Sequence, residues 1–167
     1  MSFPTALVVL SDSRADGRRE DRVIPTCREA LAGSPLALEE AQVISDDRDG
    51  IIEALRALVA NPRIQLVITA GGTGLAPRDN APEATRQVIE REAPGLSELL
   101  RLKGLDHTPH AMLSRGVAGT AGGTLIVNLP GSPKAVLEGI ETLLPILPHA
   151  LETLAGAASE CARGKEM

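Results

Sequence analysis

Four polar, turn-forming segments hold the residues most able to do chemistry, and each directly follows an apolar segment typical of a buried strand. They are residues 11–13, 45–47, 71–79 and 130–132. In a parallel sheet the carboxyl ends of the strands share one edge, and ligands of open α/β sheets bind in the crevice at that edge. The sequence therefore predicts that these four loops meet and form one site.

The glycine-rich segment Gly71-Gly72-Thr73-Gly74 is the predicted phosphate-binding loop. Glycine lets the backbone adopt a positive φ and turn successive N–H groups toward an oxyanion, and Thr73 adds a hydroxyl donor. The segment has neither the lysine of a Walker motif nor the spacing GxGxxG. A tight turn without a ligand is an equally good interpretation.

Asp46 and Asp79 are the carboxylates predicted to be catalytic and to hold Mg²⁺. Mg²⁺ that accompanies a nucleotide is usually held by one or two carboxylates together with substrate phosphates. Asp47 and Asp49 are alternatives to Asp46, but both could instead cap the following helix, which is the interpretation favoured for Asp49. Asp79 could likewise be a loop or capping acid.

Two basic side chains are candidates for binding an anionic ligand. Lys134 follows Ser132 and Pro133 in the first turn of a predicted helix, where its charge and the positive end of the helix both favour an anion. Arg78 could contact a phosphate. The alternative for both is an ordinary exposed surface charge.

Apolar, β-branched runs predict the strands that position these loops. We expect strands at residues 5–10, 36–44, 66–69 and 124–129; helices ending near 32 and 61; a helix from Asn80 to about 92, with Glu83 in capping-box spacing; helices at 96–104 and 111–116; and helices from Ser132 to Pro145 and on to about Leu154. Strands that alternate with helices and are apolar throughout indicate a three-layer α/β sandwich, with helices on both faces of a mostly parallel sheet. Residues 1–154 are predicted to be one domain and residues 155–167 a frayed tail.

Composition excludes several classes of protein. The 167 residues are 43% apolar, carry a net charge of −5, and include one Phe but no Tyr or Trp. An acidic chain without stacking aromatics is not expected to bind nucleic acid. We also expect no membrane association, because no apolar run approaches the roughly 20 residues that span a bilayer. Cys27 and Cys161 are predicted to be free thiols in a reducing cytoplasm.

The longest motifs resemble those of one known family. The segment GGTGLAPRDNAPEAT, residues 71–85, resembles the signature of the molybdopterin-binding (MogA/MoaB-like) proteins. Ser11-Asp12, Asp46-Asp47, the LSR of residues 113–115 and the NLPGSPKAV of residues 128–136 follow in family order. The similarity runs from about residue 5 to residue 154. Residues 21–24 depart from the first-loop pattern of the family, which leaves the substrate contacts of that loop open.

The resemblance implies a mixed, mainly parallel sheet, a homotrimer or hexamer, and molybdopterin adenylyltransferase activity in molybdenum cofactor biosynthesis. In that reaction ATP, with Mg²⁺, and molybdopterin give adenylyl-molybdopterin and pyrophosphate, and the product passes to a molybdate-insertion protein. The two essential acids of the family fall on Asp46 and Asp79, and the loop at residues 71–74 would hold nucleotide phosphates. The nucleotide and pterin pocket would be lined by Ser11, Asp12, Gly131, Ser132 and Lys134.

Two other functions are compatible with the same domain type. One is a non-catalytic molybdopterin-binding or scaffold subunit, and retention of both Asp46 and Asp79 favours the enzyme over it. The other is a nicotinamide-nucleotide-processing enzyme of the competence/damage-inducible type. The arginine–aspartate pair at residues 78–79 and the short chain are unlike the loop and the extra domain of those proteins. Direct molybdate insertion is disfavoured for the same reason of length.

Overall fold

A single mixed sheet forms the centre of the protein. The structure is a computed structural model that describes residues 1–156. Within them six strands are ordered β2-β1-β3-β6-β5-β4. Their bounds are Phe3–Leu10 (β1), Leu36–Ile44 (β2), Leu66–Ala70 (β3), Arg91–Glu92 (β4), Ala118–Ala121 (β5) and Thr124–Leu129 (β6). The first four strands of that order are parallel, whereas β5 pairs antiparallel with both β6 and β4.

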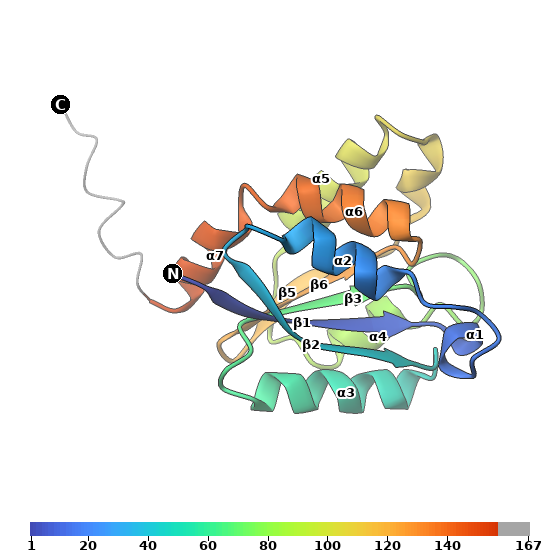
Figure 1. Cartoon of the computed structure of the whole chain (residues 1–167), viewed down its shortest axis with the longest axis horizontal. Helices are drawn as coiled ribbons and strands as arrows, with labels where there is room; N and C mark the ends of the chain where they lie inside the picture. Colours follow the sequence, from blue (N-terminus) through green and yellow to red (C-terminus); the bar gives the residue numbers. More distant parts are fainter. Residues whose placement is uncertain (157–167) are drawn as a thin grey trace.

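Helices cover both faces of this sheet (Figure 1). The helices are α1 (Asp12–Ala15), α2 (Val23–Leu31), α3 (Arg48–Ala60), α4 (Ala81–Arg86), α5 (Pro94–Gly104), the 3-10 helix η1 (Pro109–Leu113), α6 (Pro133–Leu143) and α7 (Leu147–Leu154). Helices α2, α5, α6 and α7 pack on one face, and α3 and α4 pack on the other. The predicted three-layer sandwich is confirmed.

The strand β1 shows why the predicted strands do not alternate between apolar and polar residues. Leu7 and Val9 belong to the core beneath α2 and α6, whereas Ala6, Val8 and Leu10 belong to the core beneath α3. Both faces of the strand are thus buried, as expected where helices cover a parallel sheet on both sides. This burial fixes the end of β1, and therefore the start of the loop at Ser11.

Four local predictions were wrong. The helix predicted to reach residue 92 ends at Arg86, and the chain continues into β4. The strand β5 was not predicted, and the short helix at 111–116 lies instead at Pro109–Leu113. Part of the turn-forming segment predicted at residues 11–13 belongs to α1. Of the predicted tail, residues 157–167 lie outside the described part of the chain, as does Cys161, while Cys27 is a buried free thiol.

None of the helices within residues 1–156 is both long enough and apolar enough to span a membrane.

Candidate functional site

The loops that follow β1 and β2 are joined through two aspartates. The backbone N–H of Asp12 donates to Oδ2 of Asp46, and the backbone N–H of Asp46 donates to Oδ1 of Asp12, each at 3.0 Å. The N–H of Ser11 donates to the carbonyl of Ile44 at 3.0 Å, and the Ser11 hydroxyl accepts from the N–H of Arg14. These bonds place both carboxylates at the carboxyl edge of the sheet, as predicted from the order of the loops.

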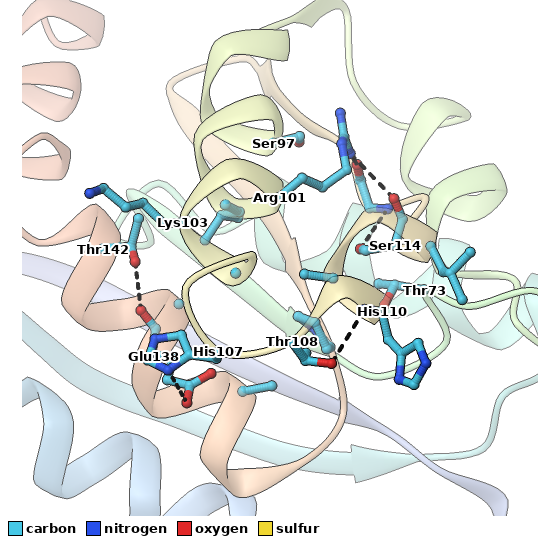
Figure 2. A pocket seen from close by; sticks show the side chains of 18 of the residues that line it. Thr73, Ser97, Arg101, Lys103, His107, Thr108, His110, Ser114, Glu138 and Thr142 are labelled. Atoms are coloured by element: carbon cyan, nitrogen blue, oxygen red, sulfur yellow. Dashed lines mark hydrogen bonds and ion pairs between the residues drawn. The ribbon is translucent and has the colours of Figure 1, made fainter.

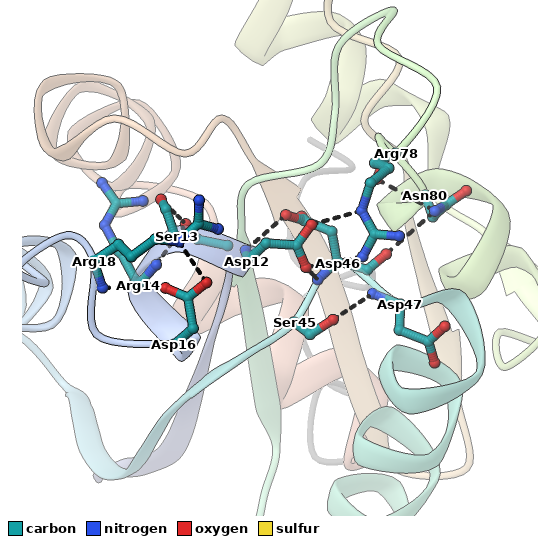
Figure 3. A network of polar contacts seen from close by, with 11 residues as sticks. Asp12, Ser13, Arg14, Asp16, Arg18, Ser45, Asp46, Asp47, Arg78 and Asn80 are labelled. Carbon is teal, nitrogen blue, oxygen red and sulfur yellow. Dashed lines mark hydrogen bonds and ion pairs between the residues drawn. The ribbon is translucent and has the colours of Figure 1, made fainter.

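Arg78 brings the loop that follows β3 to the same place (Figure 3). Its Nε and Nη2 donate to the two carboxylate oxygens of Asp12 at 2.6 and 2.8 Å. The side-chain amide of Asn80 donates to the carbonyl of Asp46 at 3.2 Å. The structure therefore joins Asp12, Asp46 and Arg78 into one polar cluster, although they come from three different loops.

The two joined aspartates have opposite electrostatic environments. The hydrogen bonds from Arg78, followed by the N–H of Asp46, hold the pKa of Asp12 well below its usual range. Burial raises the pKa of Asp46 above its usual value, and the negative charges of Asp12 and Asp79 raise it further, against the N–H bond from Asp12. Asp46 is thus a partly buried carboxyl group beside other negative charges, a position that a bound cation would stabilise.

The glycine loop has the backbone conformation that its sequence predicts. Gly71 and Gly72 adopt φ values of +118° and +63°. A side chain on Gly71 would overlap the carbonyl oxygen of Leu10, and one on Gly131 would lie 3.0 Å from the Cα atom of Gly71. The loops after β1, β3 and β6 therefore approach one another at the backbone, which only glycine permits.

Asp79 closes the other end of this loop. Its Oδ2 accepts the backbone N–H of Ala76 at 2.8 Å, and a Cβ atom on Gly74 would lie 2.8 Å from the same oxygen. No hydrogen bond joins Asp79 to Asp46 in the structure, but the two residues are close enough for the charge of Asp79 to raise the pKa of Asp46. Asp79 therefore has a visible role in shaping the loop, beside any role toward a ligand.

Arg115 holds both ends of the loop, a role that sequence reasoning missed. Its Nε donates to the carbonyl of Gly74 and its Nη2 to the carbonyl of Asp79, both at 2.7 Å. Its backbone N–H donates to the carbonyl of Thr73 at 2.8 Å, and its guanidinium pairs with Glu83. The arginine was noted only as the last residue of the LSR motif, and nothing in the local spacing indicated these partners.

The capping assignments near the site also need correction. Asp47, not Asp49, caps α3, since its Oδ2 accepts the N–H of Gly50 at 2.9 Å. Asn80 lies at the predicted N-cap position of α4, but its side chain accepts no cap bond, and its Nδ2 donates instead to the carbonyl of Asp46. Glu83 pairs with Arg115 and forms no capping box with Asn80.

The predicted cap of α6 is confirmed. The hydroxyl of Ser132 accepts the N–H of Ala135 at 3.1 Å, so the helix begins at the sheet edge as expected. Lys134 follows in its first turn, is largely exposed, and has its Nζ 3.7 Å from Oε1 of Glu138.

A cavity of about 300 Å³ opens beside the glycine loop, between α5, η1 and α6 (Figure 2). Thr73 and Gly74 form one wall of the cavity, and Pro130, which belongs to the loop after β6, also lines it. Asn128 lies at its base, where its side-chain amide donates to the hydroxyls of Thr69 and Thr85 at 2.8 and 2.9 Å. The polar cluster and this mainly apolar cavity therefore share the glycine loop as a common wall.

The carboxylates at the edge of the sheet fit Mg²⁺ only if a bound ligand supplies further oxygen atoms. Within residues 1–156 no group of three or more His, Cys, Asp or Glu side chains is arranged to hold a metal ion. Asp46, with its raised pKa and the nearby charge of Asp79, offers the one or two carboxylates that Mg²⁺ takes when phosphates complete its coordination.

These features define an open, mostly parallel α/β sheet whose candidate binding loops lie at a topological switch point. From β1 the chain crosses to β2 on one side, while β3 lies on the other, and the loops after β1 and β3 diverge at that point. Residues 6–149 match the model of the probable molybdopterin binding domain. The chain belongs to this family, as its motifs predicted.

Curated relatives carry the names of enzymes in the same biosynthesis. The molybdopterin adenylyltransferase of Helicobacter pylori is 37% identical over 87% of this chain and 84% of its own length. That of Escherichia coli is 41% identical over 81% of this chain and 70% of its own. The molybdenum cofactor synthesis protein cinnamon of Drosophila melanogaster is 39% identical over 92% of this chain, which spans only 26% of that protein.

Solved structures confirm the fold. The molybdopterin biosynthesis enzyme MoaB of Thermus thermophilus superimposes with a TM-score of 0.87 at 48% identity, over 92% of this chain and 97% of that one. The protein CinA of Thermoplasma acidophilum, at 19% identity and a TM-score of 0.62 over 90% of this chain and 98% of that one, shares the fold alone.

Proposed function

We propose that this protein is a molybdopterin adenylyltransferase that acts in molybdenum cofactor biosynthesis. Membership of the molybdopterin-binding family supports this, and so do the adenylyltransferase names of relatives that match most of the chain. The observation that carries the proposal is the shared wall at Thr73 and Gly74, which separates the polar cluster of Asp12, Asp46 and Arg78 from a cavity of about 300 Å³. Such a site can hold a triphosphate and a second, ring-bearing substrate side by side.

The reaction brings together two anions, so charge and position dominate its catalysis. An oxygen of the terminal phosphate of molybdopterin forms a bond to the α-phosphorus of ATP. The bond from that phosphorus to the oxygen bridging to the β-phosphate breaks, and pyrophosphate leaves with the electron pair. No protein nucleophile is needed, which agrees with a site built of carboxylates, glycines and an arginine.

Each part of the site has an assigned role in this proposal. The N–H groups of residues 72–74 and the amino end of α6, at Ser132 and Lys134, hold nucleotide phosphates, while the N–H of Gly71 donates to the carbonyl of Leu129 at 3.0 Å and shapes the turn. Ser11, Asp12 and Gly131 line the space between the loops, and Arg78, which pairs with Asp12, exchanges that carboxylate for a phosphate. Asp46 and Asp79 would hold Mg²⁺, which would supply positive charge to offset that of the phosphates. The cavity between α5 and α6 receives the pterin.

One observation favours a second candidate, a binding subunit without turnover. The Oδ2 of Asp79 is already engaged by the N–H of Ala76 at 2.8 Å, as expected of an acid that only shapes its loop. In that case Asp79→Asn would retain the loop, because an asparagine oxygen accepts the same bond.

The replacement Asp79→Asn separates the two candidates. If Asp79 serves the reaction, adenylyl transfer should fall by about 10²–10³ while molybdopterin still binds. Asp46→Asn should behave alike, and the double variant should be little slower than either single variant, because both acids would serve one ion. Single-turnover rates at saturating ATP and Mg²⁺ measure this. A parental rate for Asp79→Asn contradicts its assigned role and favours the binding subunit.

We also propose that residues 1–154 act as one domain and that the protein assembles as a homotrimer, with a hexamer as the alternative, in the cytoplasm. Exposed apolar side chains at Leu102, Leu105 and Met112, on and beside α5, provide a surface for such assembly. Light scattering should give about three times the chain mass of 17.4 kDa. A monomer at micromolar concentration contradicts the trimer. The product would pass to a molybdate-insertion protein.

A further inference from the structure

A second pocket, of about 400 Å³, lies at the amino end of α5. Its walls come from the end of α4, from β4, from the first turns of α5 and from the segment that leads into β5. It shares Ser97, Arg101, Ser114 and Gly116 with the cavity of Figure 2, so the two spaces meet along one side of α5. The function proposed above makes no use of this pocket.

The pocket has an excess of positive charge. Three arginines line it, of which Arg86 pairs with Glu92 at 3.1 Å and Arg115 pairs with Glu83. Arg101 has no carboxylate partner within residues 1–156, and its Nη1 donates only to the carbonyls of Ser114 and Gly116, at 3.4 and 3.2 Å. The Nε and Nη2 groups of this arginine are therefore available to a planar or tetrahedral oxyanion.

Ser97 supplies an independent observation. The residue is only 5% exposed, and its hydroxyl has no hydrogen-bond partner in the described part of the chain. A buried polar atom that lacks a partner is costly, so such atoms are uncommon in folded proteins. Ser97 precedes Arg101 by one turn of α5, and Figure 2 shows both on the side of that helix that faces Ser114. The unpaired hydroxyl and the unpaired guanidinium thus line the same space.

The start of α5 adds a third contribution of the same sign. The residue before this eleven-residue helix is Ala93, whose side chain cannot cap it, and no side-chain cap bond is made. In its first turn Pro94 has no N–H and the N–H of Leu96 donates to the carbonyl of Ala93 at 3.2 Å, so the N–H of Gly95 and the positive end of the helix dipole are what favour a negative charge there. The hydroxyl of Ser97, the guanidinium of Arg101 and the amino end of α5 all favour binding of a negatively charged ligand.

We infer that this pocket is a binding site for a small oxyanion of the phosphate type, held by Ser97, Arg101 and the amino end of α5. The inference stands on the geometry of the pocket and does not depend on adenylyl transfer. Because the pocket adjoins the cavity assigned to the pterin, an anion bound here lies directly behind the wall that Arg101 and Ser114 form.

Inorganic phosphate is the probe for this site. Two-dimensional amide NMR spectra of the full chain, recorded during a phosphate titration, show where phosphate binds. We expect saturable shifts at Val117 and Ala118, which line the second pocket and not the pterin cavity, together with a shift at Ser97, which lines both. Phosphate bound by the glycine loop would instead shift residues 71–74, and phosphate in the pterin cavity would shift Thr108 and Ala135. The location of the shifts therefore separates this inference from the proposed nucleotide site.

Two variants test the named side chains. Arg101→Gln should weaken phosphate binding at these amides by at least about tenfold, the effect of losing one hydrogen bond to a charged group, and Arg101→Lys should restore part of it. Ser97→Ala should weaken binding by about threefold to tenfold, yet leave the melting temperature without phosphate unchanged or higher, because it removes an unpaired buried hydroxyl. Arg63→Gln, which changes an exposed arginine paired with Glu39, is the matched control.

Three results would overturn the inference. One is the absence of saturable shifts at Ser97, Val117 and Ala118. Another is phosphate affinity at these amides that is the same in Arg101→Gln and in the parent. The third is a change of oligomeric mass in Arg101→Gln without any phosphate binding, which would make the pocket a contact between subunits.

Discussion

Replacing Arg115 with glutamine tests whether the glycine loop must be held in shape to bind a nucleotide. The substitution removes the donors that reach the carbonyls of Gly74 and Asp79 and leaves the backbone N–H bond to Thr73 in place. The loop would then lose its contacts with the guanidinium at Gly74 and Asp79, while the sheet beneath it keeps its buried residues. We expect the protein to fold and the loop to sample other conformations.

The magnitude follows from the contacts that are lost. Hydrogen bonds to a charged donor contribute about 1.5–3 kcal/mol when buried, and the side chain of Arg115 is 34% exposed, so we take about 1 kcal/mol for each of the two. The pair with Glu83 is similarly exposed and adds little. Together the bonds favour the ordered loop by about 2 kcal/mol, a factor of about 30 in its population. ATP affinity should fall by up to that factor.

Calorimetric titration of ATP in the presence of Mg²⁺ measures the effect. Arg86→Gln is the matched control, since among the residues that the structure describes this arginine pairs only with Glu92, at 3.1 Å, and makes no bond to the loop. It should bind ATP within twofold of the parent. If Arg115→Gln also binds within twofold, while its circular dichroism spectrum is parental, the loop keeps its shape without the arginine and this reasoning fails.

Three further predictions concern single residues. Gly72→Val should abolish ATP binding in a folded protein, because the φ of +63° is strained for valine; calorimetric affinity within twofold of the parent would contradict this. Burial raises the pKa of Cys27 to about 11, so a disulfide reagent at about pH 8 should modify it in a Cys161→Ser chain only after unfolding; rapid labelling of the native protein would refute this. The hydrogen bond from Arg115 lowers the pKa of Glu83 below its ordinary value of 4.5. The pair therefore stabilises the fold fully at pH values above 4.5, and this stabilisation is lost as the pH falls through the lowered pKa of the folded protein. Urea titrations should therefore show that Glu83→Gln is less stable than the parent at neutral pH and equal to it in acid, and a difference that is independent of pH would be evidence against the pair.

The main architecture could be predicted because burial on both faces leaves a local trace in the sequence. Each of β1, β3 and β6 is an apolar run that a pattern search finds. The strand β5 leaves no such trace, because it consists of the small residues AGTA. A side chain on Gly119 would lie 2.6 Å from the carbonyl of Arg91, so this strand is defined by its close approach to β4. That approach depends on residues about thirty positions apart in the chain.

The meeting of the loops that form the candidate site could be predicted, but not the bonds between them. The order of the strands was enough to bring Asp12, Asp46 and residues 71–74 to one edge. The partner of Asp12 proved to be Arg78, which is 66 positions away, and the loop depends on Arg115, which is 36 positions beyond Asp79. Side-chain pairing across loops is decided by the packed fold, whereas spacing along the chain reports only on neighbours. The cap at Asp47 was misassigned because either aspartate fits the local pattern.

The cluster at the sheet edge is preorganised but not electrically balanced. Arg78 offsets one of the three carboxylates Asp12, Asp46 and Asp79, which leaves two negative charges where a triphosphate is proposed to bind. The raised pKa of Asp46 has burial as its main cause, and the neighbouring acids add to it. A nucleotide alone would increase this repulsion, whereas a divalent cation held between the phosphates and the carboxylates would replace part of it by attraction. The same acids that oppose free ATP would therefore favour its magnesium complex, which is the form used in the reaction proposed above.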